Sequence, residues 1–118
     1  MYSQTVRDHF ARPRNVGELQ HPDAVGRANN DADGDLVQLH LQIENGKITE
    51  VKMKVMGCVA AIAATSRFTE MIKNGTVTDA LGITKETLTD ALGGLPESKV
   101  RCSLTCIDAL KNALSENR

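Results

Sequence analysis

Hydrophobic and polar residues alternate most regularly in the middle of the chain. Between residues 36 and 44 every second position is apolar: Val37, Leu39, Leu41 and Ile43. Residues 48–56 repeat this pattern with Val51, Met53 and Val55. Such alternation is typical of strands that bury one face. Asn45-Gly46 separates the two segments and favours a type I′ turn. The sequence therefore predicts an antiparallel hairpin, with His40 on its polar, solvent-facing side.

Apolar residues recur at helical spacing on both sides of this hairpin. Near the start of the chain, Ser3 can cap a short helix in which Val6 and Phe10 stack, and Pro13 should end it. After the hairpin, a helix that starts beyond Cys58 and stops at Gly75 would bury Ala61, Ala64, Phe68, Met71 and Ile72.

Cap residues and apolar spacing in the C-terminal third of the chain predict three further helices. Thr76 can cap the first and Thr84 the second, which ends at Gly93-Gly94. The last would run from about Ser103, as its cap, to Ser115, and its buried face would carry Leu104, Ile107, Leu110 and Leu114. With a short strand near residues 24–28, these elements predict an α+β fold in one domain, residues 1–118. It would have a small three-stranded antiparallel sheet with helices packed on one face.

Composition narrows the classes of function. The chain has 118 residues, a formal net charge of −1 and 41% hydrophobic residues. With so small a charge, attraction to nucleic acid or to an anionic membrane is not expected. The longest strongly apolar stretch, residues 55–64, is too short to span a bilayer, and the first ten residues contain no signal core. A cytoplasmic protein is the expectation.

Candidate chemistry is concentrated in the cysteines, which number three and so cannot all pair as disulfides. Cys58 follows Gly57 where a strand should give way to a helix, and Cys102 adjoins Arg101 just before the last predicted helix. The amide groups and dipole of a helix start favour thiolate, the form that binds metal. Cys106, one turn further on, is either a core residue or an additional thiol that could serve as ligand or resolving group.

Taken in order, these segments resemble the IscU family of scaffolds, together with the N-terminal domain of NifU and the related SufU. The segments that carry the resemblance span nearly the whole chain: Tyr2-Ser3 to His9-Phe10, Pro13 to Gly17, Gly34-Asp35, Gly57-Cys58 with Ala61 to Ala63 and Ser66, Leu95-Pro96, Cys102-Ser103, and Asp108 to Leu110. The resemblance implies the IscU/SufE-like fold. It also implies a scaffold, not an enzyme, that assembles a [2Fe–2S] cluster from iron and from sulfur delivered by a cysteine desulfurase. Such a scaffold passes the cluster to apo iron–sulfur proteins, and zinc is an alternative occupant.

The resemblance also assigns candidate ligands. Cys58 and Cys102 match two of the three ligand cysteines of the family, and Asp35 matches the aspartate of its CGD segment. Asp33 replaces the first cysteine. Arg101 replaces a histidine and cannot bind metal, because it stays protonated. The implied cofactor-binding residues are therefore Asp33, Cys58 and Cys102. Together with Asp35 they would form a set of two oxygens and two sulfurs that suits zinc.

Three functions remain open from the sequence. The first is a working scaffold whose cluster has an oxygen ligand. The second is a zinc-binding, SufU-like sulfur acceptor for a desulfurase. The third is a regulator that binds a desulfurase without metal. The tract Leu95-Pro96-Glu97-Ser98-Lys99 departs from the LPPVK that the specialised Hsp70 chaperone reads, so the resemblance does not extend to that partner. A homodimer is compatible with all three functions.

Overall fold

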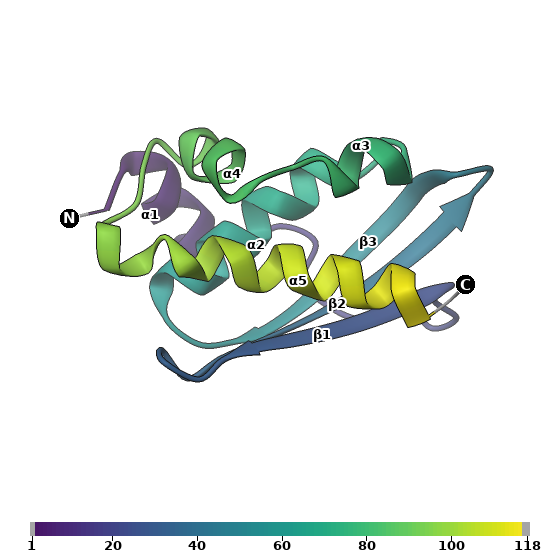
Figure 1. Ribbon diagram of the computed structural model, residues 1–118, viewed down its shortest axis with the longest axis horizontal. Helices are drawn as coiled ribbons and strands as arrows, with labels where there is room; N and C mark the ends of the chain where they lie inside the picture. Colours follow the sequence, from purple (N-terminus) through teal and green to yellow (C-terminus); the bar gives the residue numbers. More distant parts are fainter. Residues whose placement is uncertain (1, 117–118) are drawn as a thin grey trace.

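A three-stranded antiparallel sheet forms one layer of the molecule, and the helices cover one of its faces (Figure 1). The computed structural model describes residues 2–116, so both ends of the predicted domain lie outside the described residues. The elements, in chain order, are α1 (Gln4–Ala11), β1 (Ala24–Asn30), β2 (Asp35–Glu44), β3 (Lys47–Met56), α2 (Val59–Ile72), α3 (Val77–Leu81), α4 (Lys85–Ala91), the 3-10 helix η1 (Glu97–Lys99) and α5 (Arg101–Glu116). The α+β fold class is confirmed.

The predicted hairpin is confirmed as β2 and β3. Asn45 and Gly46 both have positive φ, at 53° and 77°, as a type I′ turn requires. The register slips once: Gln42 pairs with Glu50, whereas Ile43 pairs with Ile48. Thr49 is therefore an extra residue in β3, and this bulge lets Ile48 face the core although it is out of phase with Val51.

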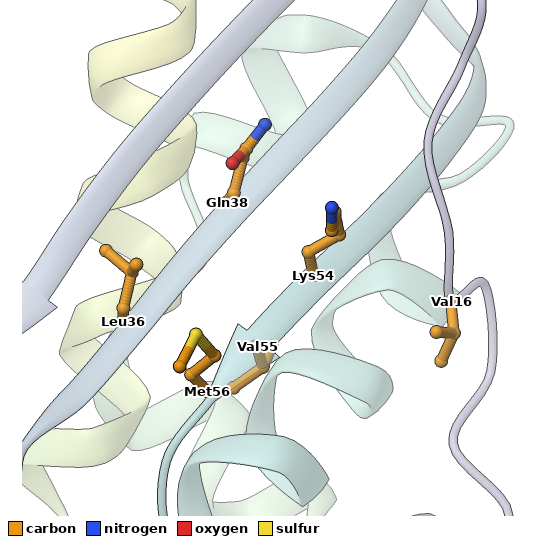
Figure 2. Close-up of a pocket in the computed structure, with 6 residues that line it drawn as sticks. All are labelled: Val16, Leu36, Gln38, Lys54, Val55 and Met56. Atoms are coloured by element: carbon orange, nitrogen blue, oxygen red, sulfur yellow. The ribbon is translucent and has the colours of Figure 1, made fainter.

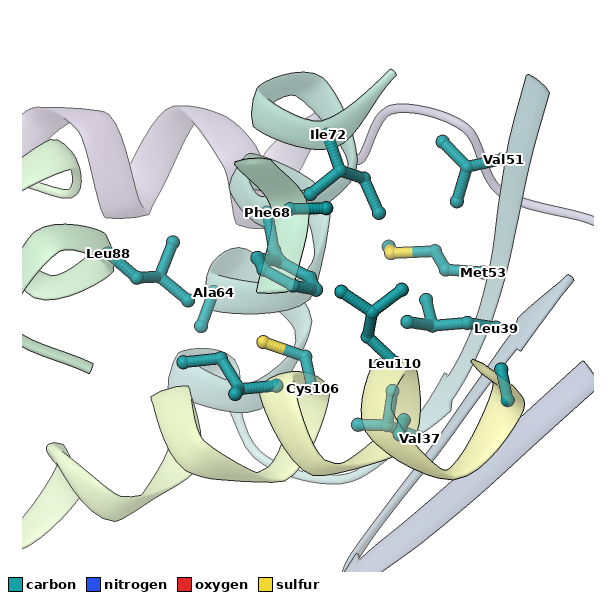
Figure 3. Close-up of a cluster of buried hydrophobic side chains, with 14 of the residues drawn as sticks. Val37, Leu39, Val51, Met53, Ala64, Phe68, Ile72, Leu88, Cys106 and Leu110 are labelled. Carbon is teal, nitrogen blue, oxygen red and sulfur yellow. The ribbon is translucent and has the colours of Figure 1, made fainter. Parts of the chain in front are cut away.

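The core lies between the sheet and the helices (Figure 3). Its members from β2 and β3 include Leu39 and Met53, which meet Phe68 of α2 and Leu110 of α5. The predicted strand at residues 24–28 is confirmed and extends to Asn30. Gly26 lets α5 approach β1 closely, because a Cβ atom there would lie 2.1 Å from the carbonyl oxygen of Ala109.

Three helix caps are as predicted. The hydroxyl of Ser3 accepts a hydrogen bond from the amide of Val6, and Thr76 and Thr84 cap α3 and α4 in the same way. Of the two residues expected to stack, Val6 is buried, whereas Phe10 is 43% exposed and lies outside the core. The neighbouring His9 turns inward instead, and its Nδ1 lies 2.7 Å from the hydroxyl of Ser66 in α2.

The start of the last helix was also placed wrongly. Helix α5 begins at Arg101, and Ser103 lies inside its first turn with its amide already bonded to the carbonyl oxygen of Val100. Ser103 is thus not the cap of α5, and its side chain is buried. The earlier start comes from η1, which already winds the chain into a helical turn. Leu104 is 38% exposed, while Ile107 and Leu110 are buried as predicted.

His40 is buried, not exposed as predicted, because residues 12–23 cross the outer face of the sheet. This segment runs beside β3, where the amide of Gly17 donates to the carbonyl oxygen of Met53. Further on, the amide of Leu19 donates to Nδ1 of His40 at 3.3 Å. The sequence pattern of a single strand could not reveal this second cover.

Candidate metal centre

Three potential metal ligands from distant parts of the chain meet at one end of the sheet. Asp35 is the first residue of β2, Cys58 is the N-cap of α2, and Cys102 lies in the first turn of α5. The two sulfur atoms are 3.7 Å apart, and Oδ2 of Asp35 lies 3.6 Å from Cys58 and 3.5 Å from Cys102. All three donor atoms fall within 4.8 Å of one another, a spacing that allows one ion to contact them all.

Gly57 makes room for Asp35. The carboxylate accepts a hydrogen bond from the amide of Cys58 at 2.9 Å, which places it flat against the turn between β3 and α2. A Cβ atom on Gly57 would lie 2.2 Å from Oδ1 of Asp35, too close for any side chain. The glycine that precedes Cys58 is thus required by the position of the Asp35 carboxylate.

The centre is closed on one side and open on the other. Asp35 and Cys102 are buried, and Cys102 packs with Ala60 and Ala61 of α2 in a small apolar cluster. Cys58 is only half-buried. An incoming ion or ligand would therefore approach along the Cys58 side.

Arg101 attracts a Cys102 thiolate, as expected from their adjacency, but other effects outweigh this attraction. Burial, together with the nearby Cys58 and Asp35, raises the pKa of the Cys102 thiol well above its ordinary value. The ion-pair partner of Arg101 is Asp33, whose Oδ2 lies 2.7 Å from Nε of Arg101. Without metal Cys102 is therefore a neutral thiol, and a bound cation would have to displace its proton.

Asp33 lies beside this centre but belongs to a different set of contacts. Its Oδ2 is 3.8 Å from the sulfur of Cys102, yet it is outside the group of three donors. Arg101 Nε donates to Oδ2 at 2.7 Å and Lys99 Nζ to Oδ1 at 3.0 Å. The hydrogen bonds from Arg101 and then Lys99 hold the pKa of the Asp33 carboxyl far below its ordinary value.

Cys106 is not brought to the centre. Its side chain lies in the core beside Phe68 and Ala64 (Figure 3), and its thiol donates to the carbonyl oxygen of Ser103. Burial raises the pKa of this thiol to about 12. Its surroundings are those of a packed core residue.

The sequence patterns did not indicate two roles. Gly57 leaves space for the Asp35 carboxylate, and Lys99 forms an ion pair with Asp33. In the sequence, Lys99 was considered only as the last residue of the segment that corresponds to the chaperone motif LPPVK. A signal was present in the ligand pattern: an acid and a base occupy the two positions that depart from it, and opposite charges often mark a contact.

A shallow hollow on the outer face of the sheet is separate from the metal centre. Figure 2 shows its lining residues, which are Val16, Leu36, Gln38, Lys54, Val55 and Met56. Leu36 directly follows Asp35, and Met56, which is 72% exposed, lies two residues before Cys58. None of the three donors lines this hollow. Among the described helices, none has both the length and the apolar character to cross a membrane.

The fold and this centre define a class: small α+β domains that bring cysteine and aspartate side chains together at one end of a sheet. The family model of the NifU-like N terminal domain matches residues 1–118. The chain belongs to this family.

Named relatives agree with this assignment. The iron–sulfur cluster assembly scaffold protein IscU 1 of Archaeoglobus fulgidus is 44% identical over 97% of this chain and 74% of its own length. The scaffold protein IscU of Aquifex aeolicus is 38% identical over 98% and 74%. A crystal structure of the N-terminal part of a nitrogen-fixing NifU-like protein from Brucella abortus matches with a TM-score of 0.82. It is 16% identical and covers 98% of this chain and 92% of that one, which shows a shared fold.

Proposed function

We propose that this chain is a scaffold on which iron–sulfur clusters are assembled, and that residues 1–118 form a single scaffold domain. The observation that carries the proposal is the meeting of Asp35, Cys58 and Cys102 within 4.8 Å. These ligands come from three separate segments, and their convergence has no evident role in packing the sheet. The relatives described above as cluster assembly scaffold proteins support the same function.

The donor set suits iron as cargo. Thiolates are the usual protein ligands of iron–sulfur clusters, and a carboxylate oxygen also binds iron. A [2Fe–2S] cluster takes four ligands, whereas this group supplies three. The remaining position would be filled from outside, on the open side near Cys58. Sulfur would come from a cysteine desulfurase, and apo iron–sulfur proteins would receive the finished cluster.

Anaerobic reconstitution tests this proposal. The protein is incubated with iron, cysteine, a cysteine desulfurase and dithiothreitol, which reduces persulfide sulfur to sulfide, and visible absorbance is recorded after desalting. The wild type should become coloured, and Cys58→Ala and Cys102→Ala should stay colourless. Cys106→Ala is the matched control, because it removes a thiol that lies in the core, and it should keep the colour. A folded wild type that remains colourless would overturn the proposal.

Zinc binding is the second candidate. Three protein ligands and one free position are the pattern of zinc sites that exchange their fourth ligand. In this function the chain would accept sulfur from a desulfurase and hold no stable cluster. Stoichiometric zinc in the purified protein, with faster desulfurase turnover and no colour on reconstitution, would favour this candidate over the first.

A further inference from the structure

Asp33, Lys99 and Arg101 form one connected group of charges at the edge of the metal centre. The Asp33 side chain is only 7% exposed and contacts both cations. Arg101 approaches both carboxylate oxygens, with Nε 2.7 Å from Oδ2 and Nη2 3.4 Å from Oδ1. Asn30 donates a further hydrogen bond to Oδ2 at 2.8 Å. We call the first three residues the clamp.

The clamp leaves Asp33 little freedom to bind metal. To reach an ion between the two sulfurs, the carboxylate would have to give up its bonds to Lys99, Arg101 and Asn30. Two cations would then lie close to the ion with their partner withdrawn. Asp35 has no comparable cation partner in the described residues, and its Oδ2 already faces both thiols.

The clamp also joins two segments that carry ligands. Asp33 lies in the turn between β1 and β2, two residues before Asp35, while Arg101 begins α5 and directly precedes Cys102. The ion pair therefore bridges the same two segments that a metal ion bound to Asp35 and Cys102 would bridge. Cys102 in turn lies 3.7 Å from Cys58.

We propose that Asp33, Lys99 and Arg101 are positioning residues that hold the start of α5 against the β1–β2 turn, so that Asp35, Cys58 and Cys102 are assembled before any metal binds. The assignment of this centre as a metal site rests on the proposed function, but the clamp itself is a property of the metal-free chain. The two departures from the family pattern act as a pair: Asp33 and Arg101 replace a cysteine and a histidine and form one ionic bridge.

Hydrogen exchange on the metal-free protein tests the clamp without cargo. Chelator-treated wild type, Asp33→Asn and Arg101→Met are compared in peptides covering residues 29–36 and 98–106. Both variants should exchange about ten-fold faster in both peptides, because each loses a charged hydrogen bond that joins them. Arg101→Lys keeps the charge and should restore most of the protection. Asp31→Asn is the matched control, since Asp31 lies in the same turn and, among the described residues, its carboxylate accepts a hydrogen bond from Asn29 alone.

Cobalt(II) supplies a second readout. At saturation, wild type and Asp33→Asn should show the same thiolate-to-cobalt absorbance, because Asp33 is no ligand. The affinity of Asp33→Asn should be about ten-fold lower, since the ligands must then be ordered on binding. A changed spectrum at saturation, or unchanged exchange in Asp33→Asn, would overturn the proposal. A wild type that binds no cobalt would overturn the proposed metal site, and the exchange result would still decide the clamp.

Discussion

The sharpest prediction concerns Gly57, which is not itself a ligand. A Cβ atom at this position would stand 2.2 Å from Oδ1, 2.9 Å from Cγ and 3.0 Å from Cβ of Asp35. Ordinary contacts begin near 3.4 Å, so Gly57→Ala would displace the carboxylate by roughly 1 Å or more. Because the side chain of Asp35 can rotate, the fold should survive the substitution. The carboxylate, however, should move from its present position.

Two losses follow from this displacement. The hydrogen bond from the amide of Cys58 to Asp35, 2.9 Å long, would be broken. Loss of a hydrogen bond to a charged group costs about 1.5–3 kcal/mol, so the free energy of unfolding should fall by about 2 kcal/mol. As a proposed ligand, Asp35 would also no longer offer its oxygen to the metal, and the metal affinity should fall roughly 10–100-fold.

Zinc titration against a competing chelator measures the affinity, and urea unfolding of the metal-free protein measures the stability. Gly75→Ala is the matched control, because a Cβ atom there would meet nothing closer than 3.4 Å and the residue has no positive φ. It should bind zinc as the wild type does. If Gly57→Ala binds zinc with wild-type affinity, Asp35 is not a ligand and the reasoning about this centre is wrong.

Two further predictions concern the stability of the fold. Gly26→Ala would place a Cβ atom 2.1 Å from the carbonyl oxygen of Ala109 and 2.4 Å from the amide nitrogen of Ala113, both backbone atoms that cannot rotate away. Urea unfolding should show a loss of about 3 kcal/mol or more, and a loss below 1 kcal/mol would contradict the close crossing of β1 and α5. The second concerns His9, whose pKa is lowered by burial and by the charge of Arg14. The unfolded chain takes up the proton first as pH falls through about 6.5, so stability should be full above that pH and decrease below it. In His9→Gln, the free energy of unfolding should decrease less steeply below that pH. An identical pH dependence of stability in both proteins would refute the lowered pKa of His9.

Local patterns predicted most of the fold. The alternation of apolar residues around Asn45-Gly46 was sufficient for the hairpin, because pairing between neighbouring strands depends on nearby residues. The caps at Ser3, Thr76 and Thr84 were predicted for the same reason. The start of α5 was missed because η1 precedes it, and η1 carries no apolar period of its own.

The features that the sequence did not predict concern contacts between distant segments. His40 has the alternation of an exposed residue, yet residues 12–23 return across it. At the metal centre, Asp33 stays a predicted ligand because it occupies a ligand position of the family, but its ionic partners were not predicted. The sequence contains Lys99 and Arg101, but it does not show that they lie within 3.0 Å and 2.7 Å of that carboxylate. Such pairings are decided by tertiary structure.

Mössbauer spectroscopy of anaerobically reconstituted protein, combined with iron and sulfide analysis, tests the central claim most directly. If Asp35, Cys58 and Cys102 hold the cargo together, the wild type should contain iron and inorganic sulfide in equal amounts and give the signal of a [2Fe–2S] cluster. Cys58→Ala should give neither. Iron without sulfide in the wild type, or an undiminished cluster signal in Cys58→Ala, would contradict the account.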